Sequence, residues 1–224
     1  MNLFDILGPV MVGPSSSHTA GAVRIGLMGR RLLGGTPKKA EILLHGSFAL
    51  TGQGHGTDRA LVAGLLGMMP DDARIPDSFR HAQEAQMEFT FGTINLRDAH
   101  PNTALLRLDD GNGQQVEFAA ASLGGGRIRV EELDGQKVAF SGDLPTLIIQ
   151  NRDQPGHVAE VTSLLSHRGI NIATMQLFRD RRGGHAAMVI EIDQALDERG
   201  LNWLRHLEGV YGAIFIEGSQ ADVI

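Results

Sequence analysis

Hydroxyl side chains and a histidine gather in a short stretch just before the first predicted helix. The stretch reads Gly13-Pro14-Ser15-Ser16-Ser17-His18-Thr19. The N-terminus of a helix presents unpaired N–H groups and a partial positive charge, so it can hold an anion such as a carboxylate. Serine hydroxyls add hydrogen-bond donors, and a histidine titrates near neutral pH. The stretch therefore indicates either a site that binds a small anion and moves a proton, or a polar loop in which Ser17 or Thr19 only caps the helix.

A second histidine stands in a similar setting before another predicted helix. Its surroundings read Gly52-Gln53-Gly54-His55-Gly56-Thr57-Asp58. The stretch partly resembles a phosphate-binding loop, but its glycine spacing fits neither the dinucleotide nor the P-loop pattern. Two loops that each bring a histidine to a helix entrance indicate a shared polar site. His45, His55 and His100 could imitate a metal-binding trio, but no known spacing supports one, so we predict no metal ligand in this chain.

Two further segments are rich in turn-forming residues. His100-Pro101-Asn102-Thr103 lies between predicted strands, and Ser122-Leu123-Gly124-Gly125-Gly126 ends another strand. Either Pro101 and the glycines only shape turns, or the three consecutive glycines let a backbone approach a ligand or a partner chain. Composition leaves both interpretations open.

The second half of the chain holds one more candidate site. Asp153-Gln154-Pro155-Gly156-His157-Val158 joins a predicted strand to a helix, and Asn171 starts the next strand. We expect Gly156, His157 and Asn171 to lie near one another at a helix N-terminus, where the carboxylate of a small amino acid could dock. The alternative is a simple turn in which Gly156 only relieves backbone strain.

The second half also has the clearer pattern of elements. It predicts strands at 144–150, 170–178, 186–192 and 210–216. Apolar residues at helical spacing predict one helix that begins near Val158 and ends at Arg168, and a second helix that Asp197 caps. This order, βαββαβ, is the ferredoxin-like arrangement.

The first half is less regular. It predicts helices over 19–33 and from Thr57 to Pro70, strands at 40–45 and 87–91, and two hairpins with turns at 109–113 and 134–135. The first helix carries small residues, which indicate a face that can approach another backbone closely. They are Ala20, Gly21, Ala22, Gly26 and Gly29. The chain as a whole is predicted to be α+β, with a domain boundary near residues 140–145.

Bulk composition excludes several classes of protein. The 26 acidic residues exceed the 20 Lys and Arg, and no long basic run occurs, so non-specific binding to nucleic acid is disfavoured. The sequence has neither a signal-peptide pattern nor an apolar stretch of about 18–20 residues, so we expect a cytoplasmic protein without a membrane span. The 224 residues include no cysteine, which excludes disulfides, a thiolate nucleophile and a self-sufficient iron–sulfur cluster.

At this point two families are recognisable. Residues 144–219, with the turn Asp153-Gln154-Pro155-Gly156, resemble an ACT domain, a regulatory module that often binds amino acids. Five motifs in the first 140 residues are similar, in the same order, to the β subunit of the iron–sulfur-dependent bacterial L-serine dehydratases. They are Phe4-Asp5-Ile6-Leu7-Gly8-Pro9 and the four stretches at 13–19, 52–58, 100–103 and 122–126.

The resemblance implies a fold, a reaction and a partner. It implies that 1–142 is a serine dehydratase β domain, related to the allosteric substrate-binding domain of some phosphoglycerate dehydrogenases, and that 143–220 is an ACT domain. The reaction would be deamination of L-serine to pyruvate and ammonia, in amino-acid catabolism and gluconeogenesis. A [4Fe-4S] cluster would be required, and because this chain has no cysteine, a separate cysteine-containing α subunit would hold it.

The resemblance also implies roles for particular residues. His18 and His55 would face the active site as catalytic proton carriers, and Ser15, Ser16, Ser17 and Thr19 would bind the substrate. Gly156, His157 and Asn171 would bind an amino-acid effector of the ACT domain. The chain would also form a homodimer through its ACT or N-terminal domains.

Two rival functions explain part of the sequence. A non-catalytic amino-acid sensor built on an ACT dimer explains the second half, but it leaves the two histidine-bearing loops without a role. The regulatory half of a phosphoglycerate dehydrogenase would belong to a chain with a strand–G-x-G-x-x-G–helix unit, and this sequence shows none.

Overall fold

The computed structural model describes residues 11–13 and 15–219, with the backbone alone described at 51–55. The chain forms two compact units, Met1–Gly135 and Gln136–Ile224. The division falls earlier in the chain than residue 142, the boundary expected from the family resemblance. Within the described residues, none of the helices is long and apolar enough to cross a membrane.

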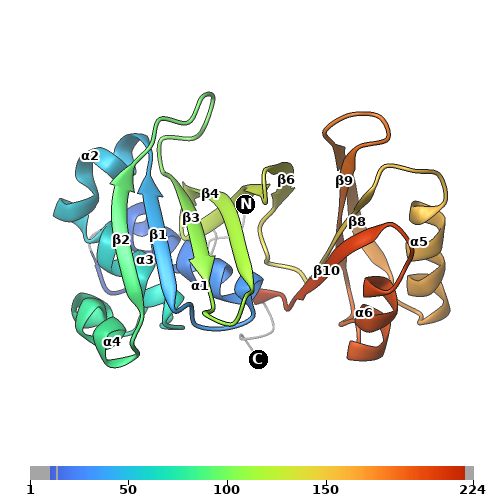
Figure 1. The fold of residues 1–224 in the computed structure, drawn as a ribbon. Coiled ribbons are helices and arrows are strands. Elements are labelled where there is room, and N and C mark those ends of the chain that lie inside the picture. The colour runs from blue at the N-terminus through green and yellow to red at the C-terminus, as the bar shows by residue number, and fades with distance from the viewer. Residues whose placement is uncertain (1–10, 14, 220–224) are drawn as a thin grey trace. The chain divides into compact units, whose positions relative to one another are not determined.

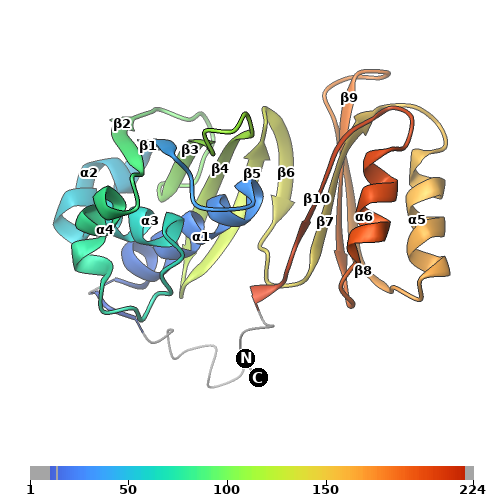
Figure 2. The ribbon, with the colours of Figure 1, turned by 60° about the horizontal axis from the view of Figure 1, so that its bottom comes forward.

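A mixed sheet organises the first unit. Within this unit the hydrogen-bonded order is β2-β1-β3-β4-β5, in which β2 runs parallel to β1 and the other neighbours are antiparallel. The strands are β1 (Lys39–Leu44), β2 (Glu88–Thr93), β3 (Thr103–Asp109), β4 (Gln115–Gly124) and β5 (Arg127–Leu133), and β6 (Gln136–Phe140) follows at the start of the second unit. The helices pack on one face of this sheet (Figures 1 and 2).

The helices of the first unit differ in part from the prediction. They are the π-helical η2 (Ser16–Gly21), α1 (Ala22–Leu33), α2 (Gly46–His55), α3 (Thr57–Leu65), the short 3₁₀ turn η3 (Ile75–Asp77) and α4 (Ser78–Glu84). Helical structure begins at Ser16 and is capped by Ser15, so the expectation that Ser17 or Thr19 is the cap is wrong. Helices α2 and α4 were not predicted. Three glycines give α2 a low helix propensity, and tertiary contacts override it.

The small residues of α1 do bring two backbones together. A Cβ added at Gly26 would lie 2.3 Å from the carbonyl oxygen of Leu61 on α3, and one added at Gly64 would lie 2.1 Å from that of Val23. Contacts this short leave no room for a side chain on either helix. The predicted close approach is therefore confirmed for α1 and α3.

The second unit is the predicted βαββαβ fold. Its elements are β7 (Thr146–Arg152), α5 (His157–His167), β8 (Ile172–Arg179), β9 (His185–Ile192), α6 (Glu198–Arg205) and β10 (Val210–Ile216). The sheet order is β10-β7-β9-β8, and both helices cover one face of it (Figure 2). Leu147, Val161 and Leu204 are fully buried in the core between them. Asp197 caps α6, as predicted, by accepting the N–H of Gly200 at 2.8 Å.

Candidate functional site

Segments far apart in the sequence meet around η2 in the first unit. Ser122, in strand β4, donates its hydroxyl to the carbonyl oxygen of Ser17 at 2.9 Å and its N–H to that of Asn102 at 2.9 Å. The N–H of Gly125 donates to the Ser16 hydroxyl at 3.4 Å. The structure thus brings three of the predicted motifs, at 13–19, 100–103 and 122–126, to one place.

A fourth segment, the start of α2, joins them. The N–H of Ser47 donates to the carbonyl oxygen of Pro101 at 2.7 Å, and the N–H of His45 donates to that of Thr103 at 3.0 Å. Gly46 has φ 55°, and a Cβ on it would lie 2.6 Å from the same Pro101 oxygen. Only glycine therefore allows α2 to begin this close to the 100–103 segment.

His18 lies among these segments with both ring nitrogens near hydroxyl groups. Nδ1 is 3.4 Å from Oγ of Ser15, which also accepts the backbone N–H of His18 at 3.2 Å. Nε2 is 3.3 Å from Oγ of Ser47. The ring packs edge-on against Phe48, with 5.3 Å between the ring centroids. A hydroxyl can donate to a bare nitrogen or accept from an N–H, so this arrangement suits both the neutral and the protonated imidazole.

The predicted substrate-binding residues divide into two kinds. Ser15, Ser16 and Ser17 are half-buried and lie beside His18 in the chain. Thr19 is only 3% exposed, and its Oγ1 has no hydrogen-bond partner among the residues that the structure describes. It faces the backbone of Gly13, where an added Cβ would lie 2.4 Å from that oxygen. The hydroxyl of Thr19 is thus covered, unlike the three serines.

The second histidine loop differs from its prediction. Helix α2 continues through His55, so residues 52–55 are helical and only Gly56, with φ 70°, separates α2 from α3. Gly56 is the N-cap of α3, and no side chain caps that helix. The side chain of His55 lies outside the described part of the structure, so its predicted meeting with His18 stays a prediction.

The remaining histidines of the supposed metal trio bind backbone groups. Nδ1 of His45 accepts the N–H of Leu96 at 3.2 Å, and Nδ1 of His100 accepts the N–H of Asn102 at 3.1 Å. These contacts give both histidines a part in holding local structure. Within the described residues, no group of three His, Asp or Glu side chains could hold a metal ion.

Sequence reasoning missed Ser47 and Phe48, which contact His18. Neither lies in a pattern that indicates chemistry. The one local signal was Gly46, a glycine directly after a predicted strand, where a turn with positive φ can start a helix.

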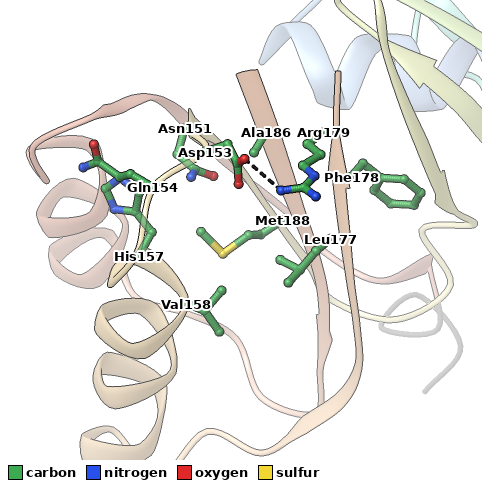
Figure 3. Close-up of a pocket in the computed structure, with 10 residues that line it drawn as sticks. All are labelled: Asn151, Asp153, Gln154, His157, Val158, Leu177, Phe178, Arg179, Ala186 and Met188. Carbon is green, nitrogen blue, oxygen red and sulfur yellow. Dashed lines mark hydrogen bonds and ion pairs between the residues drawn. The ribbon is translucent and has the colours of Figure 1, made fainter. Parts of the chain in front are cut away.

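The second unit contains a pocket of about 240 Å³. Figure 3 shows polar side chains, among them Asp153 and Arg179, together with apolar Val158, Leu177 and Met188. The full lining is Asn151, Asp153, Gln154, His157, Val158, Leu177, Phe178, Arg179, Ala186 and Met188. An amino acid has the same mixture of charged groups and an apolar portion, so the pocket suits a ligand of that kind.

Asp153 is held as a carboxylate at the edge of this pocket. Its Oδ2 accepts the N–H of Gly183 at 2.9 Å and Nη1 of Arg179 at 3.1 Å. The N–H of Gly183 is the main cause that lowers the pKa of Asp153; desolvation opposes it, and the guanidinium of Arg179 adds a smaller lowering effect. The arrangement places a negative and a positive group side by side at the pocket.

Two buried polar atoms of the lining lack hydrogen-bond partners within the described part of the chain. Nδ2 of Asn151 donates to the carbonyl oxygen of Arg152 at 2.7 Å, but Oδ1 of Asn151 has no partner. Nδ1 of His157 lies 3.3 Å from Oε2 of Glu160, while Nε2 has no partner. Both residues are 3% exposed. Because an unsatisfied buried polar atom is costly, a ligand or water that bonds to it would stabilise this region.

Only part of the predicted effector set lies at this pocket. Gly156, with φ 108°, is the N-cap of α5, and His157 lines the pocket. Asn171 does not line the pocket. Its Nδ2 donates to Oδ2 of Asp193 at 2.7 Å, and its backbone N–H donates to Oε1 of Gln194 at 2.8 Å. It precedes β8, whose other end supplies Leu177 and Arg179, about 20 Å away along a strand. The expectation that Asn171 lies near Gly156 within one chain is wrong, because α5 carries the chain to the opposite end of the sheet.

Comparison with known proteins identifies both units. A family model described as "Serine dehydratase beta chain" matches residues 2–98, and one described as "ACT domain" matches residues 146–202. The chain is 39% identical to the probable L-serine dehydratase beta chain of Bacillus subtilis, over 93% of this chain and 94% of that one. It is also 39% identical to the L-serine dehydratase beta chain of Peptoniphilus asaccharolyticus, over 87% and 88%.

A longer relative matches over about half its length. L-serine dehydratase 2 of Escherichia coli is 28% identical over 90% of this chain but only 49% of that protein. The βαββαβ unit is an ACT domain, as its pattern and the family match agree. With two beta chains matched at 39% over nearly their full lengths, the chain belongs to the family of L-serine dehydratase beta chains.

Proposed function

We propose that this chain is the β subunit of an L-serine ammonia-lyase that converts L-serine to pyruvate and ammonia only together with a separate α subunit. The observation that carries the proposal is the meeting of three family motifs and the start of α2 around His18. The names of the two relatives that match over nearly their full length, each a beta chain, support a second subunit. The complex would act in the cytoplasm.

The residues of this chain do not fit the iron–sulfur cluster of such enzymes. A [4Fe-4S] cluster is held by cysteine thiolates, and the chain contains no cysteine. We therefore assign the cluster to cysteines of the α subunit. What this chain contributes has to come from its own hydroxyl and imidazole groups.

Conversion of serine to pyruvate begins with loss of the α-proton and the β-hydroxyl as water, and ammonia is released afterwards by hydrolysis. The first step requires a base for the α-proton, and His18 is our first candidate. Its two ring nitrogens lie near hydroxyls that can partner it before and after it takes a proton. His55 is the second candidate. Ser15, Ser16 and Ser17 would bind the carboxylate or hydroxyl of serine, whereas Thr19 could do so only after Gly13 moves away from its hydroxyl.

Co-expression with the cysteine-containing α subunit under anaerobic conditions tests this function. We expect a copurified complex that contains iron and forms pyruvate from L-serine, while neither chain alone does so. A chain that copurifies with no partner and only binds an amino acid would instead establish the non-catalytic sensor.

We further propose that the pocket of the ACT domain binds an amino-acid effector. The unpartnered buried atoms of Asn151 and His157 are the observation that favours it. Arg179 would bind the carboxylate of the ligand, and Val158, Leu177 and Met188 would contact its side chain. Asn171 could reach such a ligand only from a second copy of the chain, which accords with the expected homodimer.

Thermal unfolding of the complex with added amino acids tests the effector site. We expect L-serine or another natural amino acid to raise the melting temperature by mass action, because it binds only the folded pocket. Asn151→Ala should abolish that increase. Asn202→Ala, an exposed asparagine on α6, should leave it unchanged. If none of the natural amino acids raises the melting temperature of the wild-type complex, the pocket is not an effector site.

A further inference from the structure

A hydroxyl outside the five motifs lies against the ring of His18. Oγ of Ser47 is 3.3 Å from Nε2 of His18, although 29 residues separate them. Ser47 belongs to the first turn of α2, next to β1 in the first unit (Figure 1). The structure thus supplies a contact between the serine-rich stretch and α2 that the sequence pattern does not reveal.

The place of Ser47 is fixed independently of its hydroxyl. Its backbone N–H donates to the carbonyl oxygen of Pro101 at 2.7 Å, and Gly46 brings α2 against that carbonyl. The next residue, Phe48, is fully buried. Removal of the Ser47 hydroxyl therefore leaves the backbone bond and the packing of Phe48 in place.

The imidazole of His18 is contacted on three sides by these groups. Oγ of Ser15 lies at Nδ1, Oγ of Ser47 lies at Nε2, and Phe48 packs against the ring. Ser15 already accepts the backbone N–H of His18, so its hydroxyl hydrogen can point to Nδ1. Nε2 can then carry the proton of the neutral ring, and the oxygen of Ser47 can accept that N–H.

A hydroxyl at Nε2 suits a proton carrier better than a charged partner would. A carboxylate there would favour the charged imidazolium and hold the proton. A serine hydroxyl can turn, accepting from N–H or donating to a bare nitrogen, so it stabilises the ring in both states. The ring can therefore gain or lose a proton without changing its orientation.

We propose that Ser47 is a positioning residue for the serine ammonia-lyase reaction, which holds Nε2 of His18 and thereby fixes the orientation of the ring. This role rests on the proposed function, in which His18 carries a proton. Ser47 acts through His18 and needs no contact with the substrate.

Substitution of Ser47 in the α–β complex tests the kinetic consequence. We expect Ser47→Ala to lower kcat on the order of tenfold, as loss of one hydrogen bond to a positioned base would do, with little change in KM for L-serine. Ser47→Thr, which keeps a hydroxyl, should restore most of kcat. Ser163→Ala, an exposed serine on α5, is the matched control and should match the wild type.

Ring-nitrogen NMR shifts in the full chain provide a readout that does not depend on activity. The signals of His18 are assigned by their loss in His18→Gln. We expect Ser47→Ala to move the Nε2 signal of His18, and Ser163→Ala to leave it in place. If Ser47→Ala leaves both ring signals unchanged, the proposal is overturned. A loss of kcat that Ser47→Thr does not restore would then come from a disturbed fold around α2.

The two proposals fail separately. If His18→Ala turns over serine like the wild type, His18 is not the proton carrier and the kinetic role of Ser47 fails with it. The ring-nitrogen shifts would still decide whether Ser47 holds the ring. If His18→Ala is inactive while Ser47→Ala has wild-type kcat and shifts, the proposed function stands and only the role of Ser47 is lost.

Discussion

The two units build their candidate sites in opposite ways. The surroundings of His18 come from four segments between residues 15 and 126, joined by hydrogen bonds such as that from Ser122 to Ser17. The pocket of the ACT domain comes from one strand-to-helix turn and the two strands that face it. The first site therefore depends on how the unit packs as a whole, and the second depends mainly on local structure.

The two sites also differ in how their polar atoms are paired. Both ring nitrogens of His18 have hydroxyl partners, whereas Nε2 of His157 and Oδ1 of Asn151 have none. Preformed hydrogen bonds are what a catalytic group needs, because they hold it in position before substrate arrives. Unpartnered buried atoms are what a ligand site offers, because binding removes their cost. The difference suggests chemistry in the first unit and regulation in the second.

The largest effect expected from this contrast is on turnover. His18→Ala should lower kcat of the α–β complex by about 10²- to 10⁴-fold, the usual contribution of a general base. The iron content of the complex should not change, because this chain holds no cluster. His81→Ala is the matched control, since His81 lies on α4 and its Nδ1 lies 3.0 Å from Oε2 of Glu84, outside the surroundings of His18. Wild-type turnover of His18→Ala would exclude His18 from the chemistry and leave His55 as the candidate base of the first unit.

A packing change should damage the first site without touching a reactive group. A Cβ on Gly21 would lie 2.0 Å from Oγ of Ser122, so Gly21→Ala forces η2 away from β4. We expect a loss of about 1–3 kcal/mol in the free energy of unfolding, measured by denaturant titration, together with reduced turnover.

The control for this change is another glycine of the same unit. A Cβ on Gly35 would meet no atom within 4 Å, and its φ is not in the left-handed region. Gly35→Ala should therefore change stability by less than about 0.5 kcal/mol. Equal stabilities of the two variants would show that the contact between Ser122 and η2 does not hold the site together.

The smallest effect is a pH-dependent one in the second unit. The folded-state pKa of Asp153 is lowered, chiefly by the N–H of Gly183, so its charged form stabilises the fold above the unfolded value of about 3.9. That contribution is lost as the pH falls through the lower, folded-state pKa. The melting temperature of Asp153→Asn should lie below that of the wild type at pH 5–7, and the gap should close below about pH 4.

Asp98→Asn serves as the reference for this measurement. The Asp98 side chain is 92% exposed, and its ion pair with Arg97 is long, at 3.7 Å. Exposed ion pairs of this kind contribute little, so we expect its melting curve to follow the wild type at every pH. A gap for Asp153→Asn that persists unchanged below pH 3 would show that the loss is not electrostatic.

The sequence predicted the second unit better than the first for a physical reason. Asp197 caps its own helix three residues away, and the turn at 180–184 joins adjacent strands, so both signals are local. Helix α2 forms in spite of three glycines because Pro101, more than 50 residues later, accepts its first N–H groups. Interactions between residues so far apart in the sequence cannot be predicted from the residue types near the helix.

The same limit explains the errors at the sites. His18 and the serines could be identified because they form one run in the sequence. Ser47 could not, since its relation to His18 depends on where α2 begins. Asn171 was misplaced because the single helix α5 carries the chain from one end of the sheet to the other, so Gly156 and Asn171, only 15 residues apart, lie at opposite ends.

The crossing of α1 and α3 has a consequence for the geometry of the whole first site. Gly26 and Gly64 meet backbone against backbone, so no side chain acts as a spacer between the two helices. Helix α1 follows directly from the His18 stretch, and α3 follows directly from Gly56. The distance between those two helix starts therefore depends on a contact between backbones and not on the size of side chains. Substitutions among core side chains can alter stability, but the distance between the two histidine-bearing segments depends on the two glycines that let α1 and α3 touch.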